Sequence, residues 1–162
     1  GVSAFGLSQQ SSLSRKEAGE IIKNYFTTYP KLKEYMDANI AFAREHGYVK
    51  TIMNRKRRLK DINSRNAVVR GHAERNAINA PVQGSAADVI KLAMIKIQEE
   101  IDVLGLQSKM LLQVHDELVF DVLKTELPTL KKLIKETMEG VLDSNVPLIV
   151  DLDVGESWLE AH

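Results

Sequence analysis

An imidazole and two adjacent carboxylates lie between two apolar runs of this 162-residue chain, and their types and spacing suit metal-dependent chemistry. Residues 113–120 read QVHDELVF, and the apolar runs 109–114 and 118–123 around this polar tip predict a β-hairpin. Asp-Glu is a poor choice for a tight turn, where Asn-Gly or Asp-Gly would relieve the required backbone angles. Local costs of this kind are common at functional sites.

A hairpin tip that projects carboxylates from a rigid base suits a magnesium site. Mg²⁺ takes oxygen ligands, usually one or two carboxylates completed by water and substrate phosphates. Two such ions lower the barrier to in-line phosphoryl transfer by stabilising the attacking and leaving oxygens together. The alternative is a solvated acidic turn with His115 as a partly buried polar residue, and the residues alone leave both interpretations open.

The net charge of zero hides a strong asymmetry along the chain. Residues 44–75 contain ten Lys or Arg and three Asp or Glu, a net charge of +7. Residues 116–162 contain four Lys and eleven Asp or Glu, a net charge of −7. This asymmetry fits a protein that binds a polyanion with one part and does cation-dependent work with another, although ordinary solvated surface is the alternative.

Composition excludes several classes of protein. No cysteine is present, so disulfides and thiolate metal sites are excluded. No apolar run approaches the ~20 residues that a membrane-spanning helix needs. Residues 1–6, GVSAFG, lack the basic region and apolar core of a signal peptide, and because they lack an initiator methionine we expect a piece of a longer protein.

Local signals predict the elements of the first sixty residues. Residues 14–17, SRKE, form a capping box and predict a helix to about residue 28. Pro30 begins a second helix, which Gly47 ends as a left-handed cap. Residues 48–53 predict a short strand, and residues 54–60 a basic turn with a return strand.

The second half of the chain mixes long helices with strands. Ser64 is expected to cap a helix that residues 80–81, Ala-Pro, interrupt, and a second long helix follows over 82–104. After the 109–123 hairpin, the pattern predicts a helix over 126–142 and a strand over 147–154. This order predicts the α+β class, with helices packed on a small antiparallel sheet.

Four motifs, in the same order along the chain, resemble family A DNA polymerases, the family of bacterial DNA polymerase I. QVHDELVF resembles the motif that contains the second catalytic aspartate of that family. Residues 73–88, AERNAINAPVQGSAAD, resemble the family over a longer run, and residues 1–7 resemble the stretch after its nucleotide-binding fingers helix. Residues 155–158, GESW, and His162 resemble the end of the family's chain, so the resemblance covers essentially all 162 residues.

The resemblance implies a DNA-directed DNA polymerase, a nucleotidyltransferase of replication and repair. Asp116 is then a ligand of two catalytic Mg²⁺ ions, Glu117 an accessory carboxylate and metal ligand, and His115 a contact to the primer terminus. The reaction implied is attack of the primer 3′-hydroxyl on the α-phosphate of a deoxynucleoside triphosphate, which releases pyrophosphate. The implied partners are primer–template DNA and deoxynucleoside triphosphates, without a membrane, in the bacterial cytoplasm at the nucleoid.

Arg75, Asn79 and Gln83 match family positions that contact the DNA minor groove near the primer end. Arg75 and Asn79 are i,i+4 neighbours and share a helix face. Minor-groove edges offer acceptors in every Watson–Crick pair, so donors there test pair geometry without reading sequence. In the alternative, Arg75 is a surface ion-pair partner of Glu74 or Asp88, and Asn79 and Gln83 are helix-end caps.

The basic run at 55–60, RKRRLK, fits phosphate contacts, with Arg57 and Arg65 as the expected ligands. It resembles the family's Gly-Arg-x-Arg segment, but Asn54 stands where glycine is usual and Lys60 where proline is usual. These departures put the form of the turn in doubt. A solvated basic turn is the alternative.

Further expectations also come from the resemblance. Ser3 and Phe5 resemble residues near the templating base, although Phe5 is equally a candidate core aromatic. Residues 1–63 would be the remainder of the fingers subdomain, and residues 64–162 the C-terminal part of the palm with the catalytic hairpin. The other metal-binding aspartate, the nucleotide-binding lysine and the thumb are expected upstream. We therefore expect the chain alone to be inactive, to lack bound Mg²⁺ and to self-associate through an exposed sheet edge.

Two other functions fit parts of the pattern. One is a non-catalytic nucleic-acid-binding module that keeps the charge distribution without turnover. The other is a metal-dependent phosphohydrolase with the His-Asp pair as ligands. The second needs further metal ligands, and His46, His72 and His162 do not stand at ligand spacing.

Overall fold

The structure is a computed structural model that describes residues 3–161. Gly1, Val2 and His162 lie outside the described residues, and so do the resemblances that rest on them.

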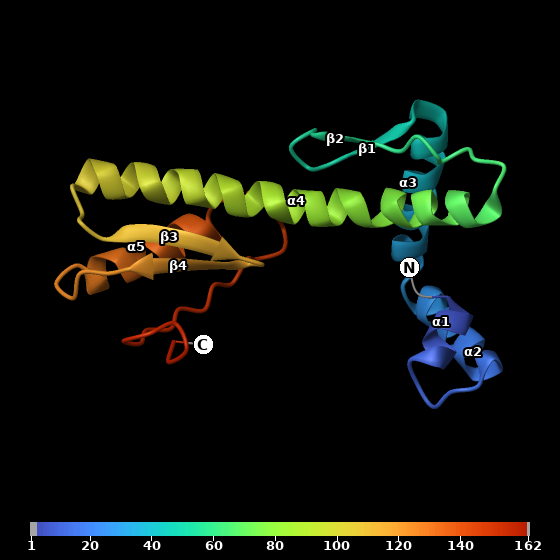
Figure 1. The fold of residues 1–162 in the computed structure, drawn as a ribbon, viewed down its shortest axis with the longest axis horizontal. Coiled ribbons are helices and arrows are strands. Elements are labelled where there is room, and N and C mark those ends of the chain that lie inside the picture. Colours follow the sequence, from blue (N-terminus) through green and yellow to red (C-terminus); the bar gives the residue numbers. More distant parts are fainter. Residues whose placement is uncertain (1–2, 162) are drawn as a thin grey trace. The chain divides into compact units, whose positions relative to one another are not determined.

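The chain forms two compact units, an N-terminal unit (Gly1–Ser85) and a C-terminal unit (Ala86–His162). The long helix α4 (Ala67–Leu104) contributes residues to both (Figure 1). The N-terminal unit also holds α1 (Ala4–Gln9), α2 (Arg15–Thr28), α3 (Pro30–His46), β1 (Tyr48–Lys50) and β2 (Lys56–Arg58). The C-terminal unit also holds β3 (Lys109–Val114), β4 (Glu117–Asp121) and α5 (Leu127–Glu139).

The local signals for α2 and α3 are confirmed. The Ser14 hydroxyl accepts from the Glu17 amide at 3.3 Å, and the Glu17 carboxylate accepts from the Ser14 amide at 2.8 Å. Hydrogen bonding to the Glu17 carboxylate, first by the Ser14 side chain and then by the Ser14 amide, lowers the pKa of Glu17. Pro30 is the first residue of α3, and Gly47 ends it with φ 75° in the left-handed region.

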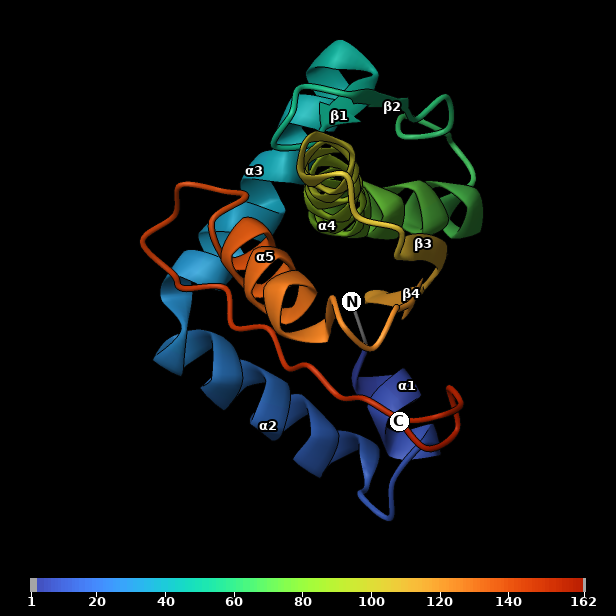
Figure 2. The same cartoon turned by 90° about the vertical axis from the view of Figure 1, so that its left-hand side faces the viewer.

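The core of the N-terminal unit joins α3, the β1–β2 hairpin and the start of α4. The hairpin is antiparallel, with Val49 opposite Arg57, and both views show it over the N-terminal half of α4 (Figures 1 and 2). Its strands have three residues each, fewer than predicted, and a two-stranded hairpin of this size needs outside packing to be stable. Packing comes from a buried cluster of residues, Ala43, Val49, Leu59, Ile62, Ala73 and Ala77.

Two predictions about α4 are wrong. The helix runs without interruption from residue 67 to 104, with Pro81 inside it. Proline in a helix interior removes one hydrogen bond and costs about 3 kcal/mol or more. Burial of Ala73 and Ala77, with Ala80 packed against them, holds the helix through this position. Its N-terminus is also not capped by Ser64, because Asn66 Oδ1 accepts from the amides of residues 68 and 69 at 2.9 and 3.3 Å.

The C-terminal unit packs α4 and α5 on the β3–β4 sheet, as both views show (Figures 1 and 2). The buried side chains are Ile97 and Ile101 from α4 with Leu130 and Ile134 from α5. The α+β class is confirmed, but residues 3–161 form two antiparallel sheets of two strands each in place of one small sheet. The hairpin is confirmed close to its predicted bounds, and the predicted helix over 126–142 is α5.

The predicted strand over 147–154 is wrong. These residues form no strand, although Leu152 packs on the α5 core and the Val150 amide donates to Glu139 at 3.1 Å. A strand needs a neighbour for its ladder, and the described residues pair no strand with this segment. Across residues 3–161, the structure also contains no helix long and apolar enough to cross a membrane.

Candidate nucleic-acid groove and carboxylate hairpin

An open groove of about 620 Å³ lies between the β1–β2 hairpin and α4 in the N-terminal unit. Among the described residues, those that line the groove include the cations Arg57, Arg58, Lys60 and Arg75, and Asp61 is the one carboxylate. The remaining lining residues are Leu59, Val68, Val69, His72, Ala73 and Asn76. This charge balance suits phosphate groups of a polyanion.

The N-terminal half of α4 presents one exposed face beside this groove. Arg75, Asn79 and Gln83 are all exposed on it, while Ala73 and Ala77 are buried on the opposite face. Within residues 3–161 the side chains of these three residues make no hydrogen bond or ion pair. Their donors are therefore available to a ligand.

The alternative roles for the same residues are not supported. Glu74 pairs with Arg44 at 2.7 Å and with Arg70 at 3.6 Å, so its carboxylate has partners other than Arg75. Asn79 and Gln83 lie in the interior of α4 and cannot cap a helix end there. The helix-end-cap interpretation depended on the interruption at Pro81, which is absent.

The basic turn keeps a left-handed residue despite the loss of the usual glycine. Asn54 has φ 62°, and asparagine tolerates this region better than most residues because its short polar side chain can bond locally. Thr51 closes the turn, since its carbonyl accepts from the Asn54 amide at 2.9 Å and its hydroxyl accepts from the Arg55 amide at 3.2 Å. Lys60, where proline is usual, lines the groove.

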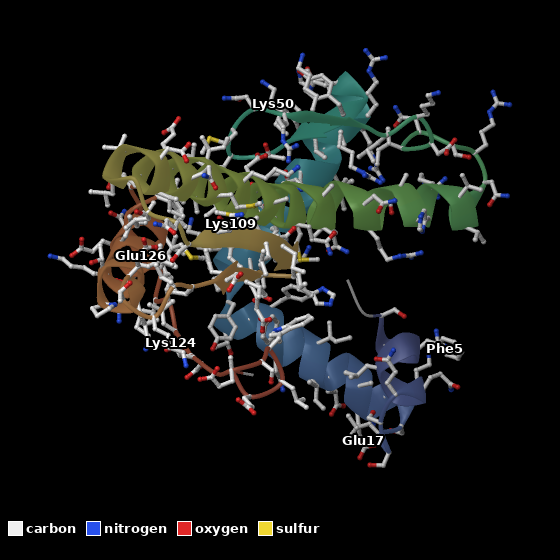
Figure 3. The ribbon with its side chains drawn as sticks, turned by 60° about the vertical axis from the view of Figure 1, so that its left-hand side comes forward. Phe5, Glu17, Lys50, Lys109, Lys124 and Glu126 are labelled. Atoms are coloured by element: carbon white, nitrogen blue, oxygen red, sulfur yellow. The ribbon has the colours of Figure 1, made fainter. Side chains whose placement is uncertain are left out.

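The structure does not bring every predicted DNA contact to the groove. Arg65 is exposed in the loop before α4 and is not a lining residue. Ser3 caps α1, its hydroxyl accepting from the Gly6 amide at 3.1 Å. Phe5 is 58% exposed on α1 (Figure 3), so its interpretation as a core aromatic is wrong. His72, considered only as a metal ligand, lines the groove three residues before Arg75, and that helical spacing was the signal for it.

The predicted position of the carboxylates at a hairpin tip is confirmed. β3 pairs with β4 with Val114 opposite Glu117, so His115 and Asp116 form a two-residue turn. His115 has φ 52°, a region that costs about 1–2 kcal/mol for residues other than glycine. The Gln113 side chain donates a hydrogen bond to the His115 carbonyl across the turn.

The donor chemistry of this tip fits part of a magnesium site. Asp116 and Glu117 offer carboxylate oxygens, the ligands that Mg²⁺ takes, and Asp116 is exposed. Among residues 3–161, no group of three or more His, Asp or Glu side chains could hold a metal ion. A complete site therefore needs ligands from outside these residues, and the phosphohydrolase hypothesis lacks the clusters that it requires.

At its base, the β3–β4 hairpin is held by a carboxylate. Glu126 accepts from the amides of Gln107 and Ser108, both at 2.9 Å, and from the Ser108 hydroxyl at 2.6 Å. The hydroxyl of Ser108, which is buried, accepts in turn from the Leu123 amide at 3.0 Å. Through Ser108, Glu126 thus joins the residue before β3, which begins at Lys109 (labelled in Figure 3), to Leu123, two residues after the end of β4. The Gln107 amide and the Ser108 hydroxyl lower the pKa of Glu126.

Almost the full length of the chain is similar to known proteins of one family. The profile of DNA polymerase family A matches residues 1–160. DNA polymerase I of Streptococcus pneumoniae serotype 4 is 53% identical over 161 residues, which are 99% of this chain and 18% of that protein. DNA polymerase I of Caldicellulosiruptor bescii is 48% identical over 160 residues, 99% of this chain and 19% of that protein.

A solved structure extends the similarity to the fold. The POL domain of Pol1 from M. smegmatis, in complex with DNA primer-template and dNTP, matches with a TM-score of 0.96 and 43% identity. The match covers 99% of this chain and 28% of that chain. This chain thus spans about a fifth of the length of the curated relatives and about a quarter of the solved one. It belongs to DNA polymerase family A.

Proposed function

We propose that this chain forms part of the polymerase domain of a DNA-directed DNA polymerase and supplies both DNA contacts and catalytic carboxylates. The observation that carries the proposal is the basic groove, which joins Arg57 of the hairpin to Arg75 of α4. The similar M. smegmatis structure holds primer–template DNA and dNTP, and these are the partners proposed here. Residues 1–63 are assigned to the fingers and residues 64–162 to the palm.

DNA binding divides between two kinds of contact. Arg57, with Arg65 as a second phosphate ligand, holds the backbone without reading sequence. Arg75, Asn79 and Gln83 donate to minor-groove acceptors, which every correct pair presents. Ser3 and Phe5 are assigned to the region of the templating base, where the exposed Phe5 ring offers a stacking surface.

The β3–β4 tip carries the catalytic groups. Polymerases of this family depend on divalent metal ions, and we assign two Mg²⁺ ions with Asp116 as a ligand and Glu117 as an accessory ligand. When bound, the metal stabilises the attacking and leaving oxygens of an in-line displacement. His115 donates an imidazole N–H to a sugar or phosphate oxygen of the primer terminus. The rigid two-residue turn keeps these three groups at one point on the sheet.

The chain alone is proposed to be inactive, because Asp116 and Glu117 supply only part of a two-ion site. Among the described residues β3 and β4 pair only with each other, and the outer edge that each leaves unpaired is the proposed site of self-association of the isolated chain. The parent enzyme is proposed to act in replication or repair in the bacterial cytoplasm at the nucleoid, and the similarity to bacterial DNA polymerase I proteins supports this proposal.

The test is a chimera in which this chain replaces the corresponding 161 residues of the S. pneumoniae polymerase. The chimera should extend a primed template in Mg²⁺ and deoxynucleotides, and the isolated chain should not. Asp116→Ala should lower the chimera's rate by about 10³-fold or more, the size expected for several kcal/mol of metal-assisted stabilisation. Asp121→Ala, at the other end of β4, is the matched control and should retain activity.

Three outcomes would contradict the proposal. Extension by the isolated chain would show that its ligand set is sufficient. Equal losses from Asp116→Ala and Asp121→Ala would remove the special role of the tip. A chimera that binds primer–template but never extends it would support the non-catalytic nucleic-acid-binding module.

A further inference from the structure

The turn between β1 and β2 is attached to α4 at two adjacent residues. Ser85 Oγ accepts a hydrogen bond from the Ile52 amide at 2.8 Å and donates one to the Pro81 carbonyl at 2.5 Å. One hydroxyl therefore joins the backbone of the turn to the backbone of α4. We call this pair of contacts, together with the neighbouring contact at Gly84, the Ser85 clamp.

Gly84 allows the turn to lie directly against the helix. A Cβ added at this position would lie 2.6 Å from Thr51 Cγ2, far inside a normal contact distance. Glycine in a helix interior costs about 1 kcal/mol relative to alanine, so the close approach has a stability cost. The bare helix surface at Gly84 and the hydroxyl at Ser85 together fix where the turn sits.

The clamp joins the two elements that carry the proposed DNA contacts. On the hairpin, Arg57 follows the turn within β2; Lys50, labelled in Figure 3, marks the end of β1 where the turn begins. On α4, Gln83 directly precedes Gly84, and Asn79 and Arg75 lie about one and two turns before Gln83. Residues 51–55 are themselves ordered by the Thr51 hydrogen bonds, so fixing the turn fixes the strand that carries Arg57.

We infer that Ser85 is a positioning residue, which sets the distance between the phosphate-binding hairpin and the minor-groove face of α4. This rests on the proposed function. Phosphates and minor-groove edges of a duplex stand at fixed separations, so both groups of contacts form together only when the hairpin and the helix are held in register. A hairpin of three-residue strands has too little structure to hold that register by itself.

The experiment uses a compensating pair of variants in the full 162-residue chain. Gly84→Ala should displace the turn, because its new Cβ meets Thr51 Cγ2. Thr51→Ser removes that methyl and keeps the hydroxyl that bonds the Arg55 amide. The Gly84→Ala chain should bind a primer–template duplex at low salt about tenfold more weakly, the size of a typical coupling between neighbouring residues, and the double variant should recover most of that loss.

Ser85 is tested by a conservative pair. Ser85→Ala should speed hydrogen exchange at the Ile52 amide and weaken duplex binding, while Ser85→Thr, which keeps a hydroxyl, should restore both. The Arg57→Ala penalty should be several-fold smaller in the Ser85→Ala background, because a misplaced arginine contributes less. A residue that only stabilises the fold would leave the Arg57→Ala penalty unchanged.

The outcomes separate this inference from the function on which it rests. If Arg57→Ala and Gln83→Ala leave duplex binding by the chain and primer extension by the chimera unchanged, the proposed function fails and the inference fails with it. If those two variants matter but Ser85→Ala speeds Ile52 exchange without changing affinity, the inference alone is overturned. Unchanged Ile52 exchange in Ser85→Ala, or no recovery in the Gly84→Ala, Thr51→Ser double variant, would also overturn it.

Discussion

The β1–β2 and β3–β4 hairpins share a build and differ in chemistry. Both are two-stranded and antiparallel, and each turns through a non-glycine residue with positive φ, Asn54 in one and His115 in the other. The first presents a run of cations beside a groove, and the second presents carboxylates at its tip. One carries charge suited to binding a polyanion, and the other carries charge suited to binding a metal ion.

The two hairpins also differ in where they are attached. The β1–β2 hairpin is held at its turn by Ser85, whereas the β3–β4 hairpin is held at its base by Ser108 and Glu126. A strand that lines a groove gains from a fixed turn, because its side chains act along its length. A tip that must reach a metal ion and a substrate needs to project, so its attachment lies at the opposite end.

The largest stability effect should come from breaking the base of the β3–β4 hairpin. Ser108→Ala removes the hydroxyl of a residue that is 3% exposed, so the Leu123 amide loses its acceptor and the Glu126 carboxylate loses a donor. Loss of these two hydrogen bonds, one of them to a charged group, costs about 1–3 kcal/mol. Native-state hydrogen exchange should therefore show faster exchange at Leu123, with the β1–β2 amides unchanged. Equal loss of protection in both hairpins would contradict separate attachment.

Acid should loosen the same base and spare the β1–β2 turn. The folded-state pKa of Glu126 is lowered from 4.5, first by the Gln107 amide and then by the Ser108 hydroxyl. The stabilisation is therefore fully present above pH 4.5 and is lost as the pH falls through the lowered folded pKa. Exchange at Gln107 and Ser108, corrected for intrinsic rates, should rise below pH 4.5. Glu126→Gln should abolish this pH dependence; if it persists, another group is responsible.

Local hydrogen bonds made parts of this fold predictable from sequence. The Ser14 capping box and the Gly47 cap depend on residues within one turn of chain, and both form as predicted. Pro81 misled the prediction because packing at distant residues holds α4 together through it. The strand at 147–154 failed for a related reason, since a strand depends on a partner that a local pattern does not contain.

The sequence predicted which residues form the candidate site better than it predicted how those residues come together in space. The hairpin tip follows from the alternation around Asp116, and its position is confirmed. The meeting of Arg57 and Arg75 in one groove depends on how the hairpin packs on α4, which no spacing encodes. Arg65 lies near both in sequence and still falls outside the groove lining. The roles of all these residues in DNA binding stay predictions.

Effects of moderate size on DNA affinity and primer extension should distinguish a charged phosphate contact from an uncharged minor-groove contact. In the chimera, Arg57→Ala should lower the slope of log affinity against log salt by about one unit, because one phosphate contact is lost. Gln83→Ala should leave that slope nearly unchanged, since the Gln83 side chain carries no charge. The loss of this side chain should instead raise the barrier to primer extension by about 1–3 kcal/mol, especially from a mismatched terminus where minor-groove acceptors are displaced.

A salt series with matched and mismatched termini measures both variants together. If Gln83→Ala matches the parent on both termini, the minor-groove role is wrong. If Arg57→Ala leaves the slope unchanged, the basic run is a solvated turn.

The smallest effects should come from giving each turn the glycine that its backbone favours. Asn54 and His115 both have positive φ, and the substitutions are Asn54→Gly and His115→Gly. Asparagine tolerates this region, so Asn54→Gly should change the free energy of unfolding by only a few tenths of a kcal/mol. His115→Gly should stabilise the chain by up to about 1 kcal/mol, because relief of strain outweighs the added freedom of the unfolded chain.

The same two substitutions should also differ in their effect on primer extension: the one that stabilises the chain more should slow extension more. In the chimera, Asn54→Gly should leave extension near the parent rate, because the turn keeps its form and Asn54 has no assigned contact. His115→Gly should slow extension, since the imidazole that contacts the primer terminus is gone. His115→Ala is the matched control, because it removes the imidazole and keeps the strained backbone: extension should fall as much as in His115→Gly, without the gain in stability. If His115→Ala extends as fast as the parent, the strain at this tip serves the turn alone and the primer contact is wrong.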